Sequence, residues 1–318
     1  MQFQNKFIQT MINRNLIRIR VVQIVYAWYQ NANRSVQNAE KTLMSGLQKS
    51  YDLYFYLLQL MVVLTRQYEI RIETKRNKFL PSEEDLHPNL HLVRNKFIRQ
   101  LKENRKLKKM LSERPMEWDV YDVFLKKLLD DILASDTYLD YCAISTPTYD
   151  EDREFWRKTF KQFIYGNEAL DDVLEEESIY WNDDIEIVQT FVLKTIKRFS
   201  QEKGTEQPLL PMFKDEEDKD FALKLLDDAI VNAAKYRKLI EKHSEKWDFD
   251  RIAFMDVIIM QIALAEIATF DSIPVSVSLN EYIEIAKNYS TPKSGTFING
   301  ILDAIVQELR DQQHLFKN

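Results

Sequence analysis

The stretch of sequence that decides the fold is WDFDRIAFMDVIIMQIALAEIATFDSIPVSVSLNEYIEIAKNYSTPKSGTFINGILDAI, residues 247–305. Its first apolar segment, residues 252–270, is long enough for a helix. It also carries Asp256, Gln261 and Glu266, and these polar groups would be costly in a lipid bilayer. We therefore predict a buried helix over this segment rather than a membrane span.

Breaks in the remainder of this stretch predict two further helices. Pro274 ends one helical region, and Ser278 with Glu281 has the spacing of a capping box, which would begin the next helix. Thr291-Pro292 breaks the chain again. Asn299-Gly300, inside an apolar helix, indicates close packing of a neighbouring backbone. These features predict how the chain folds rather than what it does.

Glycine and proline are scarce in this chain, with 5 glycines and 8 prolines among 318 residues. Tight turns, hairpins and phosphate-binding loops depend on glycine, so the scarcity favours long helices joined by short connections. Hydrophobic residues make up 45% and charged residues 30% of the chain, which is the balance of a folded protein. We therefore predict an all-α fold.

Signatures of catalysis are absent from the sequence. It contains no G-x-G-x-x-G, G-x-x-x-x-G-K-[ST] or G-x-S-x-G motif. His87 and His91 have the spacing of zinc ligands on a helix, but Pro88 lies between them, so a loop pair is favoured over a metal site. A single cysteine, Cys142, excludes an internal disulfide and is typical of a reducing compartment. We expect a cytoplasmic protein that is not an enzyme and uses no cofactor or metal.

Charge is segregated along the chain, although the net charge is only −6. Residues 1–39 contain no acid, whereas residues 130–186 are crowded with aspartate and glutamate. Residues 94–109, within a helix expected over about 89–112, hold eight basic residues against one glutamate. A basic face attracts polyanions even on an acidic protein. The basic segment is therefore either a solvated helix face or a contact with RNA.

The first helix, expected from about residue 13 to residue 30, combines arginine with tyrosine. Arg14 and Arg18 are four residues apart and share a face, and Tyr26 and Tyr29 lie further along the same broad side. Guanidinium groups neutralise phosphates and stack on bases, and exposed tyrosine rings stack on the unpaired bases of single-stranded RNA. The alternative is that each tyrosine ring is half-buried in the core.

Further helices and one linker follow from the same periodicity. A second long helix is expected over about 36–74 and contains an aromatic run at residues 51–56. Another helix is expected over 118–133. Residues 204–211 form the clearest linker, directly before an acidic helix start at 215–220, where carboxylates suit the positive end of the helix dipole.

Short motifs within residues 247–305 match the C-terminal half of the NusB family in order and spacing, so the chain resembles that family. The motifs are Arg251-Ile252-Ala253, Asp256, Glu266, Ile273-Pro274, Asn280-Glu281, Ala286-Lys287 and Phe297-Ile298-Asn299-Gly300-Ile301-Leu302-Asp303. The segment RIRVVQIVYAWYQ, residues 18–30, is similar to the family's first helix, with Gln23 and Tyr26 in register. The resemblance covers about residues 11–40 and 215–309.

This resemblance implies a NusB-like helical bundle built from residues 1–45 and 211–318, with residues 46–210 as an additional inserted helical region. It implies a transcription antitermination factor that supports rRNA transcription. The family's ligand is the boxA element of nascent RNA, a single strand. Its protein partner is NusE, a ribosomal protein that also acts in transcription, with other Nus factors and RNA polymerase as indirect partners. No membrane is involved.

Carried over by position, the resemblance also assigns individual residues. Four residues are expected to contact RNA, two in the N-terminal helix and two in the C-terminal motif: Arg14, Arg18, Lys293 and Phe297. Tyr26 and Asp256 fall where the family faces NusE. Phe297 has the alternative of a core position, and Asp256 that of capping a helix. An acid in so apolar a helix needs an explanation, which favours the partner role for Asp256.

Two features depart from the family pattern. The family's arginine cluster is thinned here, with Asn15 and Leu16 between Arg14 and Arg18, and the segment between the two matching ends has no counterpart in short family members. We hypothesise that the basic segment 94–109 extends the RNA track. The competing function is a helical scaffold whose insert binds a protein partner. An RNA-modification enzyme would need a glycine-rich cofactor domain, which the sequence lacks.

Overall fold

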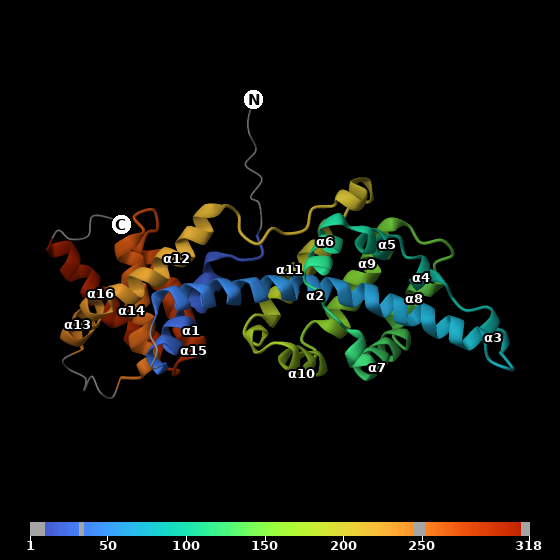
Figure 1. Cartoon of the computed structure of the whole chain (residues 1–318), viewed down its shortest axis with the longest axis horizontal. Helices are drawn as coiled ribbons and strands as arrows, with labels where there is room; N and C mark the ends of the chain where they lie inside the picture. The colour runs from blue at the N-terminus through green and yellow to red at the C-terminus, as the bar shows by residue number, and fades with distance from the viewer. Residues whose placement is uncertain (1–9, 32–34, 245–251, 313–318) are drawn as a thin grey trace, which may run out of the picture. The chain divides into compact units, whose positions relative to one another are not determined.

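The structure is a computed structural model that describes residues 10–31, 35–244 and 252–312. Every regular element within these ranges is helical, with sixteen α-helices and a few short 3₁₀ or π turns (Figure 1). The all-α fold expected from the sequence is confirmed. None of the helices in these ranges is both long and apolar enough to cross a lipid bilayer.

The chain divides into two compact units. Unit 1 comprises residues 49–212 together with the leading residues up to Met11, and unit 2 comprises residues 12–48 and 213–318. Helix α2 (Val36–Arg76) passes from one unit into the other, as the sequence predicted for a long helix in this region. The assignment of residues 46–210 to an insertion stays a prediction, because compactness does not show which part of a chain was added.

Helix α14 (Phe254–Thr269) is the centre of unit 2. All of its residues from Asp256 to Ile267 are buried, and a helix that is buried on every side needs neighbours all round. The predicted buried helix over 252–270 is therefore confirmed. Five helices surround it: α1 (Arg14–Gln30), α12 (Glu216–Val231), α13 (Ala233–His243), α15 (Val275–Tyr289) and α16 (Ser294–Asp311).

The ends of two of these helices show how local sequence sets their bounds. At the start of α1, the side chain of Asn13 accepts a hydrogen bond of 2.8 Å from the Leu16 N–H, so the helix predicted from residue 13 is confirmed. Helix α15 begins directly after Pro274, and Ser278 lies inside its first turn with its hydroxyl bonded elsewhere. The capping box predicted at Ser278 is therefore wrong.

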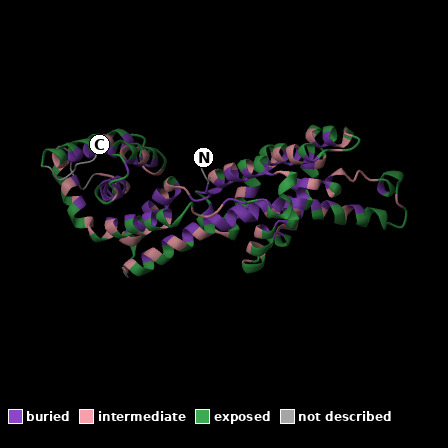
Figure 2. Cartoon of the chain, turned by 90° about the horizontal axis from the view of Figure 1, so that it is seen from above, coloured by how far each residue is buried: buried purple, intermediate pink, exposed green. Residues whose placement is uncertain are grey.

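The core of unit 1 forms around the aromatic run in α2. Tyr54 and Tyr56 are completely buried, the Tyr56 ring stacks on Trp118 at 4.0 Å between centroids, and Tyr54 bonds to the Thr195 hydroxyl at 2.8 Å. Figure 2 shows this buried stretch along the middle of α2. The other α-helices of unit 1 are α3 (Glu83–Leu86), α4 (His91–Arg94), α5 (Lys96–Glu103), α6 (Arg105–Glu113), α7 (Asp122–Leu133), α8 (Asp136–Ala143), α9 (Tyr149–Thr159), α10 (Glu168–Glu177) and α11 (Ile185–Arg198).

The basic segment is three short helices rather than the single helix predicted over 89–112. Asn95 and Asn104 interrupt it, and each uses its side-chain oxygen to cap the next helix, accepting from the Ile98 and Leu107 N–H groups. The Asn95 amide group donates to Tyr141 and to the Asp152 carbonyl, both at 3.1 Å. The Asn104 amide group likewise donates to the Gln207 carbonyl at 2.8 Å. These bonds hold both asparagines in non-helical backbone conformations, so the prediction of one continuous helix is wrong.

Two other segments differ in detail from expectation. The helix predicted over 118–133 is a 3₁₀ turn, η1 (Asp119–Tyr121), followed by α7, because the backbone of Tyr121 departs from helical angles between the two. The predicted linker 204–211 packs against α2. Leu210 is buried and its carbonyl accepts a hydrogen bond of 2.8 Å from Tyr51.

Candidate nucleic-acid interface

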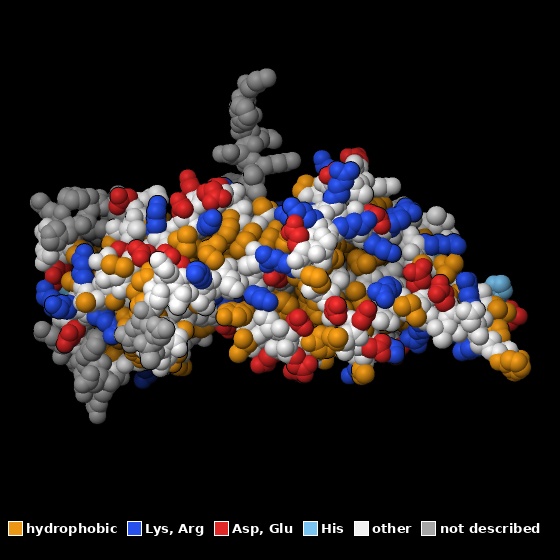
Figure 3. Space-filling model, viewed as in Figure 1, with side chains coloured by type: hydrophobic (Ala, Val, Ile, Leu, Met, Phe, Trp, Pro, Cys, Tyr) orange, Lys and Arg blue, Asp and Glu red, His pale blue; other side chains and the backbone are white. Residues whose placement is uncertain are grey.

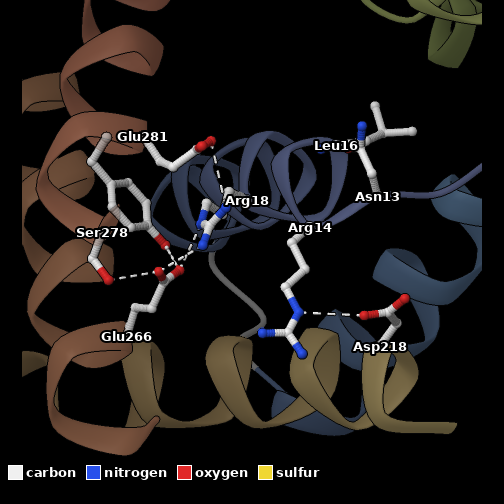
Figure 4. Close-up of polar contacts among 9 residues, drawn as sticks. Asn13, Arg14, Leu16, Arg18, Asp218, Glu266, Ser278 and Glu281 are labelled. Atoms are coloured by element: carbon white, nitrogen blue, oxygen red, sulfur yellow. Dashed lines mark hydrogen bonds and ion pairs between the residues drawn. The ribbon is translucent and has the colours of Figure 1, made fainter. Parts of the chain in front are cut away.

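Arg18 is the centre of a buried polar cluster in unit 2. Its Nε and Nη2 donate to the two carboxylate oxygens of Glu266 at 2.7 and 2.8 Å, and its Nη1 lies 3.5 Å from Glu281 (Figure 4). The same carboxylate accepts from the Ser278 hydroxyl at 2.8 Å and from the Tyr282 hydroxyl at 3.0 Å. The cluster therefore ties α1 to α14 and α15.

The electrostatics of this cluster favour a charged pair. Burial alone lowers the pKa of Arg18, but the hydrogen bonds and the charge of Glu266 outweigh it, so the pKa lies above the usual value. Burial and the Glu266 carboxylate also raise the pKa of Tyr282 well above its usual value, which keeps its hydroxyl a donor. Arg18 was expected on an RNA-binding surface, and one correction is needed: its guanidinium lies inside unit 2. Its contact with RNA stays a prediction that requires this ion pair to open.

Arg14, one turn earlier on α1, lies nearer the surface. Its Nε is 3.3 Å from Asp218 on α12, its guanidinium stands 5.0 Å above the Phe221 ring, and about a third of its side chain is exposed. Figure 4 shows that Arg14 and Arg18 reach toward different neighbouring elements. Although the two arginines are spaced to share a face of α1, their environments differ, and Arg14 is the more accessible cation.

Asp256 has partners within unit 2. The residue is 5% exposed, and its two carboxylate oxygens accept hydrogen bonds from the hydroxyls of Ser290 and Ser294, at 2.5 and 2.9 Å. Ser294 is the first residue of α16, where a negative charge is stabilised by the helix dipole. This arrangement accounts for an acid in an apolar helix. The carboxylate supports the start of α16, as the capping alternative would have it, and the role of Asp256 toward NusE stays a prediction.

Lys293 and Phe297 lie at that same helix start. Lys293 is the residue before α16 and is exposed, and Phe297 follows four residues later with its ring half-buried. Residues four apart on a helix share a face. A cation and a partly exposed ring on one face can contact a phosphate and a base of the same strand.

The structure does not bring all of the predicted RNA-binding residues together. Arg14 contacts Phe221, whose ring lies 4.7 Å from Phe270 at the C-terminal end of α14. Lys293 precedes Ser294, whose hydroxyl is bonded to Asp256 in the first turn of α14. At 1.5 Å per residue, the length of α14 separates the Arg14 site from the Lys293 site by about 20 Å. Arg14 and Lys293 are therefore separate contacts rather than one cluster.

An aromatic pair beside the first turn of α14 includes Tyr26. Its ring lies 5.9 Å from Phe254, and the two rings are 39% and 38% exposed. Tyr29 lies 5.6 Å from Phe254 and donates to Gln261 at 3.1 Å, so it is partly enclosed. Two residues along a helix turn about 200°, so Phe254 and Asp256 face different sides of α14. The aromatic pair and the Lys293 site therefore lie on different sides of this helix end.

Sequence reasoning missed two residues of this surface. The Arg237 guanidinium lies 4.3 Å from the Tyr29 ring centroid and 5.5 Å from that of Phe254, within cation–π range. Phe254 was read only as part of an apolar helix. The available signal was its position at the start of a buried helix, because the first residue of such a helix can reach solvent. Arg237 offered no signal in the sequence.

The two histidines considered as zinc ligands have separate environments. His91 is bonded through its ring nitrogens to the Asn89 side-chain oxygen and the Ile144 carbonyl. His87 is exposed and lies 3.7 Å from Glu83. In the part of the chain that the structure describes, no three metal-binding side chains come together.

Comparison with known proteins supplies a family match. The model of the NusB family matches residues 184–307. The transcription antitermination protein NusB of Salinibacter ruber is 40% identical over 132 residues, which is 40% of this chain and 82% of that protein. The NusB protein of Listeria monocytogenes serotype 4a is 38% identical over 107 residues, 34% of this chain and 83% of that protein.

Other matches are shorter or more distant. The NusB protein of Chloroherpeton thalassium is 44% identical over 100 residues, 31% of this chain and 47% of that protein. A solved structure of T. maritima NusB is 26% identical and covers 52% of this chain and 94% of that one, with a TM-score of 0.28.

The helical elements and the match to the NusB family model together define the class, a helical protein related to transcription antitermination factors. The chain belongs to the NusB family of transcription antitermination proteins, whose members are not enzymes. Of the residues that carried the resemblance in sequence, Trp247 and Arg251 lie outside the described residues.

Proposed function

We propose that this protein binds a boxA-like single-stranded RNA together with the ribosomal protein NusE and so promotes antitermination during rRNA transcription. The observation that carries the RNA part is the start of α16, where exposed Lys293 and half-buried Phe297 share one face. The cation supplies attraction to phosphate, and the ring supplies stacking to an unpaired base.

The buried interactions give this face a fixed geometry. Asp256 holds Ser290 and Ser294 on either side of Lys293, so the turn before α16 is anchored to the central helix. A preorganised turn loses less conformational freedom on binding than a loose one. Arg14, with its partly exposed guanidinium beside Phe221, adds a second contact further along the strand.

The proposed NusE surface is the aromatic pair of Tyr26 and Phe254. Aromatic residues and arginine are enriched at protein interfaces, and both occur here. Arg237 contacts the rings of Tyr29 and Phe254, which helps to fix the orientation of Phe254 before a partner binds. The RNA and NusE surfaces lie on different sides of the start of α14, which allows both ligands to bind at once.

The test is a fluorescence anisotropy titration of the full chain with a boxA RNA and with a scrambled RNA of the same composition, each with and without NusE. We expect preference for boxA, strengthened by NusE. Phe297→Ala should lower the affinity about tenfold, because stacking on one base contributes roughly 1–3 kcal/mol. Lys293→Ala should reduce the slope of log affinity against log salt concentration by about 0.7, the value for one lost phosphate contact on a single strand.

Lys238→Ala is the matched control, since Lys238 is an exposed lysine on α13 of the same unit and is not one of the proposed RNA-binding residues. Thermal unfolding of each variant separates lost binding from lost folding. Equal affinity for boxA and scrambled RNA, or full affinity in Lys293→Ala and Phe297→Ala, would contradict the RNA proposal. Tyr26→Ala with unchanged NusE affinity would contradict the partner surface.

A further inference from the structure

Unit 1 exposes an apolar surface that the proposed RNA and NusE surfaces do not include. Val120 and Val123, at η1 and the start of α7, are 68% and 84% exposed. Ile179 is 75% exposed and Tyr180 is 37% exposed, both in the 3₁₀ turn η3 (Ile179–Trp181). We call these four residues the valine–isoleucine patch. Clustered exposed apolar residues mark interaction sites, whereas isolated ones are ordinary.

Two contacts bring the halves of the patch side by side. The hydroxyl of Tyr121, between the two valines, donates to Glu177, two residues before Ile179, at 3.3 Å. Beneath the patch, Trp118 and Trp181 both pack on the Tyr56 ring, at 4.0 and 5.3 Å between centroids. The patch therefore rests on a buried aromatic base, which gives it a fixed shape.

Carboxylates border this patch. Helix α10, which ends directly before it, carries six acids and no basic residue: Glu168, Asp171, Asp172, Glu175, Glu176 and Glu177. Figure 3 shows acidic and apolar side chains next to one another over α10 and α7. On the valine side, Asp119 and Asp122 are paired with Arg66 and Lys126. Among the described residues, Asp172, Glu175 and Glu176 have no ion-pair partner.

This charge arrangement is unfavourable for the free protein. Three glutamates occupy the last turn of α10, where the helix dipole is already negative and favours cations. Burial, with Asp172 and Glu168 nearby, also raises the pKa of Asp171 on the same helix. A cationic ligand would relieve both effects. Nucleic acids and anionic lipid surfaces are excluded as occupants, because they carry the same sign of charge.

We propose that the valine–isoleucine patch docks a lysine- or arginine-rich amphipathic segment of a partner protein. The apolar side chains of that segment cover Val123 and Ile179, and its cations meet the carboxylates of Glu175 and Glu176. Apolar contact supplies most of the affinity and the opposite charges align the two surfaces. This docking needs no RNA, so it stands or falls separately from the proposed antitermination activity.

The experiment measures binding of a short helical peptide of lysine and leucine, with the leucines on one face, to the full chain by isothermal titration calorimetry. Two variants remove the two halves of the interaction: Val123→Ser with Ile179→Ser, and Glu175→Lys with Glu176→Lys. Each double variant should lower the affinity about tenfold, the change produced by losing about 1.4 kcal/mol. Two peptides serve as probes of specificity, one of lysine and serine and one of glutamate and leucine, and both should bind weakly.

Matched controls come from the same chain. Glu69→Lys with Glu73→Lys makes the same charge change on exposed positions of α2, and Val231→Ser removes an exposed valine from α12. Both controls should bind the lysine–leucine peptide like the unaltered chain. Equal binding of the lysine–serine peptide, or no effect of the Val123 and Ile179 substitutions, would overturn the proposal in favour of charge attraction alone. If the unaltered chain formed dimers at high concentration and Val123→Ser abolished them, the occupant of the patch would be a second copy of this chain, and the proposal would be overturned.

Discussion

The guanidinium of Arg18 and the carboxylate of Glu266 form a two-bond ion pair in the interior of unit 2, with bonds of 2.7 and 2.8 Å. The pair joins the first helix of the chain to the central helix. It also explains why a residue expected on a binding surface is buried. Four donors converge on this one carboxylate, so its charge is well compensated.

Removing one member of this pair should destabilise unit 2 strongly. Arg18→Met leaves the Glu266 charge buried with only neutral donors, and we expect a loss of about 3–5 kcal/mol in the free energy of unfolding. The double variant Arg18→Met with Glu266→Gln should lose less, because no uncompensated charge remains. Urea unfolding of the four proteins in this cycle provides the measurement. Additive losses in the double variant would show that the pair is not coupled.

Asp256 should act through stability. Asp256→Ala leaves the hydroxyls of Ser290 and Ser294 without their acceptor, and we expect a loss of about 1–3 kcal/mol. Asp256→Asn keeps one acceptor oxygen and should lose less. Urea unfolding and NusE affinity are measured on the same samples. Unchanged unfolding with weaker NusE binding in Asp256→Asn would restore the direct partner role predicted from the family.

The basic segment of unit 1 offers a test of RNA binding beyond unit 2. Charge reversal is made at four exposed residues: Arg94→Glu, Arg99→Glu, Lys102→Glu and Lys109→Glu. If the segment extends the RNA track, the affinity falls and the salt dependence flattens by about 0.7 log units per lost contact. The control reverses four exposed lysines elsewhere in unit 1, Lys126, Lys127, Lys158 and Lys161. An unchanged slope in the first variant removes this segment from the RNA surface.

The pH dependence of stability should reveal the raised pKa of Asp171. Burial raises its pKa in the folded state above the unfolded value of about 3.9, and Asp172 and Glu168 raise it further. Folding therefore favours the protonated form, and this contribution is lost as pH rises through the folded-state pKa. At neutral pH the ionised group is destabilising, so Asp171→Asn should increase the free energy of unfolding.

That gain should shrink as the pH is lowered through the folded-state pKa and vanish below about pH 4, where both states of Asp171 are protonated. Urea unfolding at a series of pH values measures it. Glu176→Gln, on an exposed position of the same helix, is the comparison and should gain less. A gain from Asp171→Asn that is the same at every pH would contradict the assignment of the shift to ionisation.

Local sequence predicted the features of this fold that local chemistry controls. The bounds of α1 follow from Asn13 and a regular apolar stripe, and α14 follows from an unbroken apolar run. The breaks at Asn95 and Asn104 could not be predicted in this way. Their conformations depend on Tyr141, Asp152 and Gln207, which are distant in sequence.

The sequence named most residues of the candidate site, but it could not indicate how they are arranged. Spacing placed Arg14 and Arg18 on one face, yet it could not indicate that Glu266 draws one of them inside. Ser278 had the spacing of a helix cap, and the same carboxylate holds its hydroxyl instead. Interactions between distant segments decide both outcomes, and no pattern within a single helix contains them. The RNA and NusE roles of the predicted residues stay predictions.

Because unit 2 is built from two segments that are distant in sequence, its parts are synthesised at different times. Arg18 and Glu266 are separated by 248 positions in the chain. At about 5–20 residues per second, a ribosome takes roughly 12–50 s to travel between them. During that interval the apolar stripe of α1 has been made but the helix that covers it has not. Residues 49–212 of unit 1 are also synthesised within this interval. The first helix of unit 2 therefore emerges well before its central helix, and chaperones that shield apolar segments have the most time to bind it then.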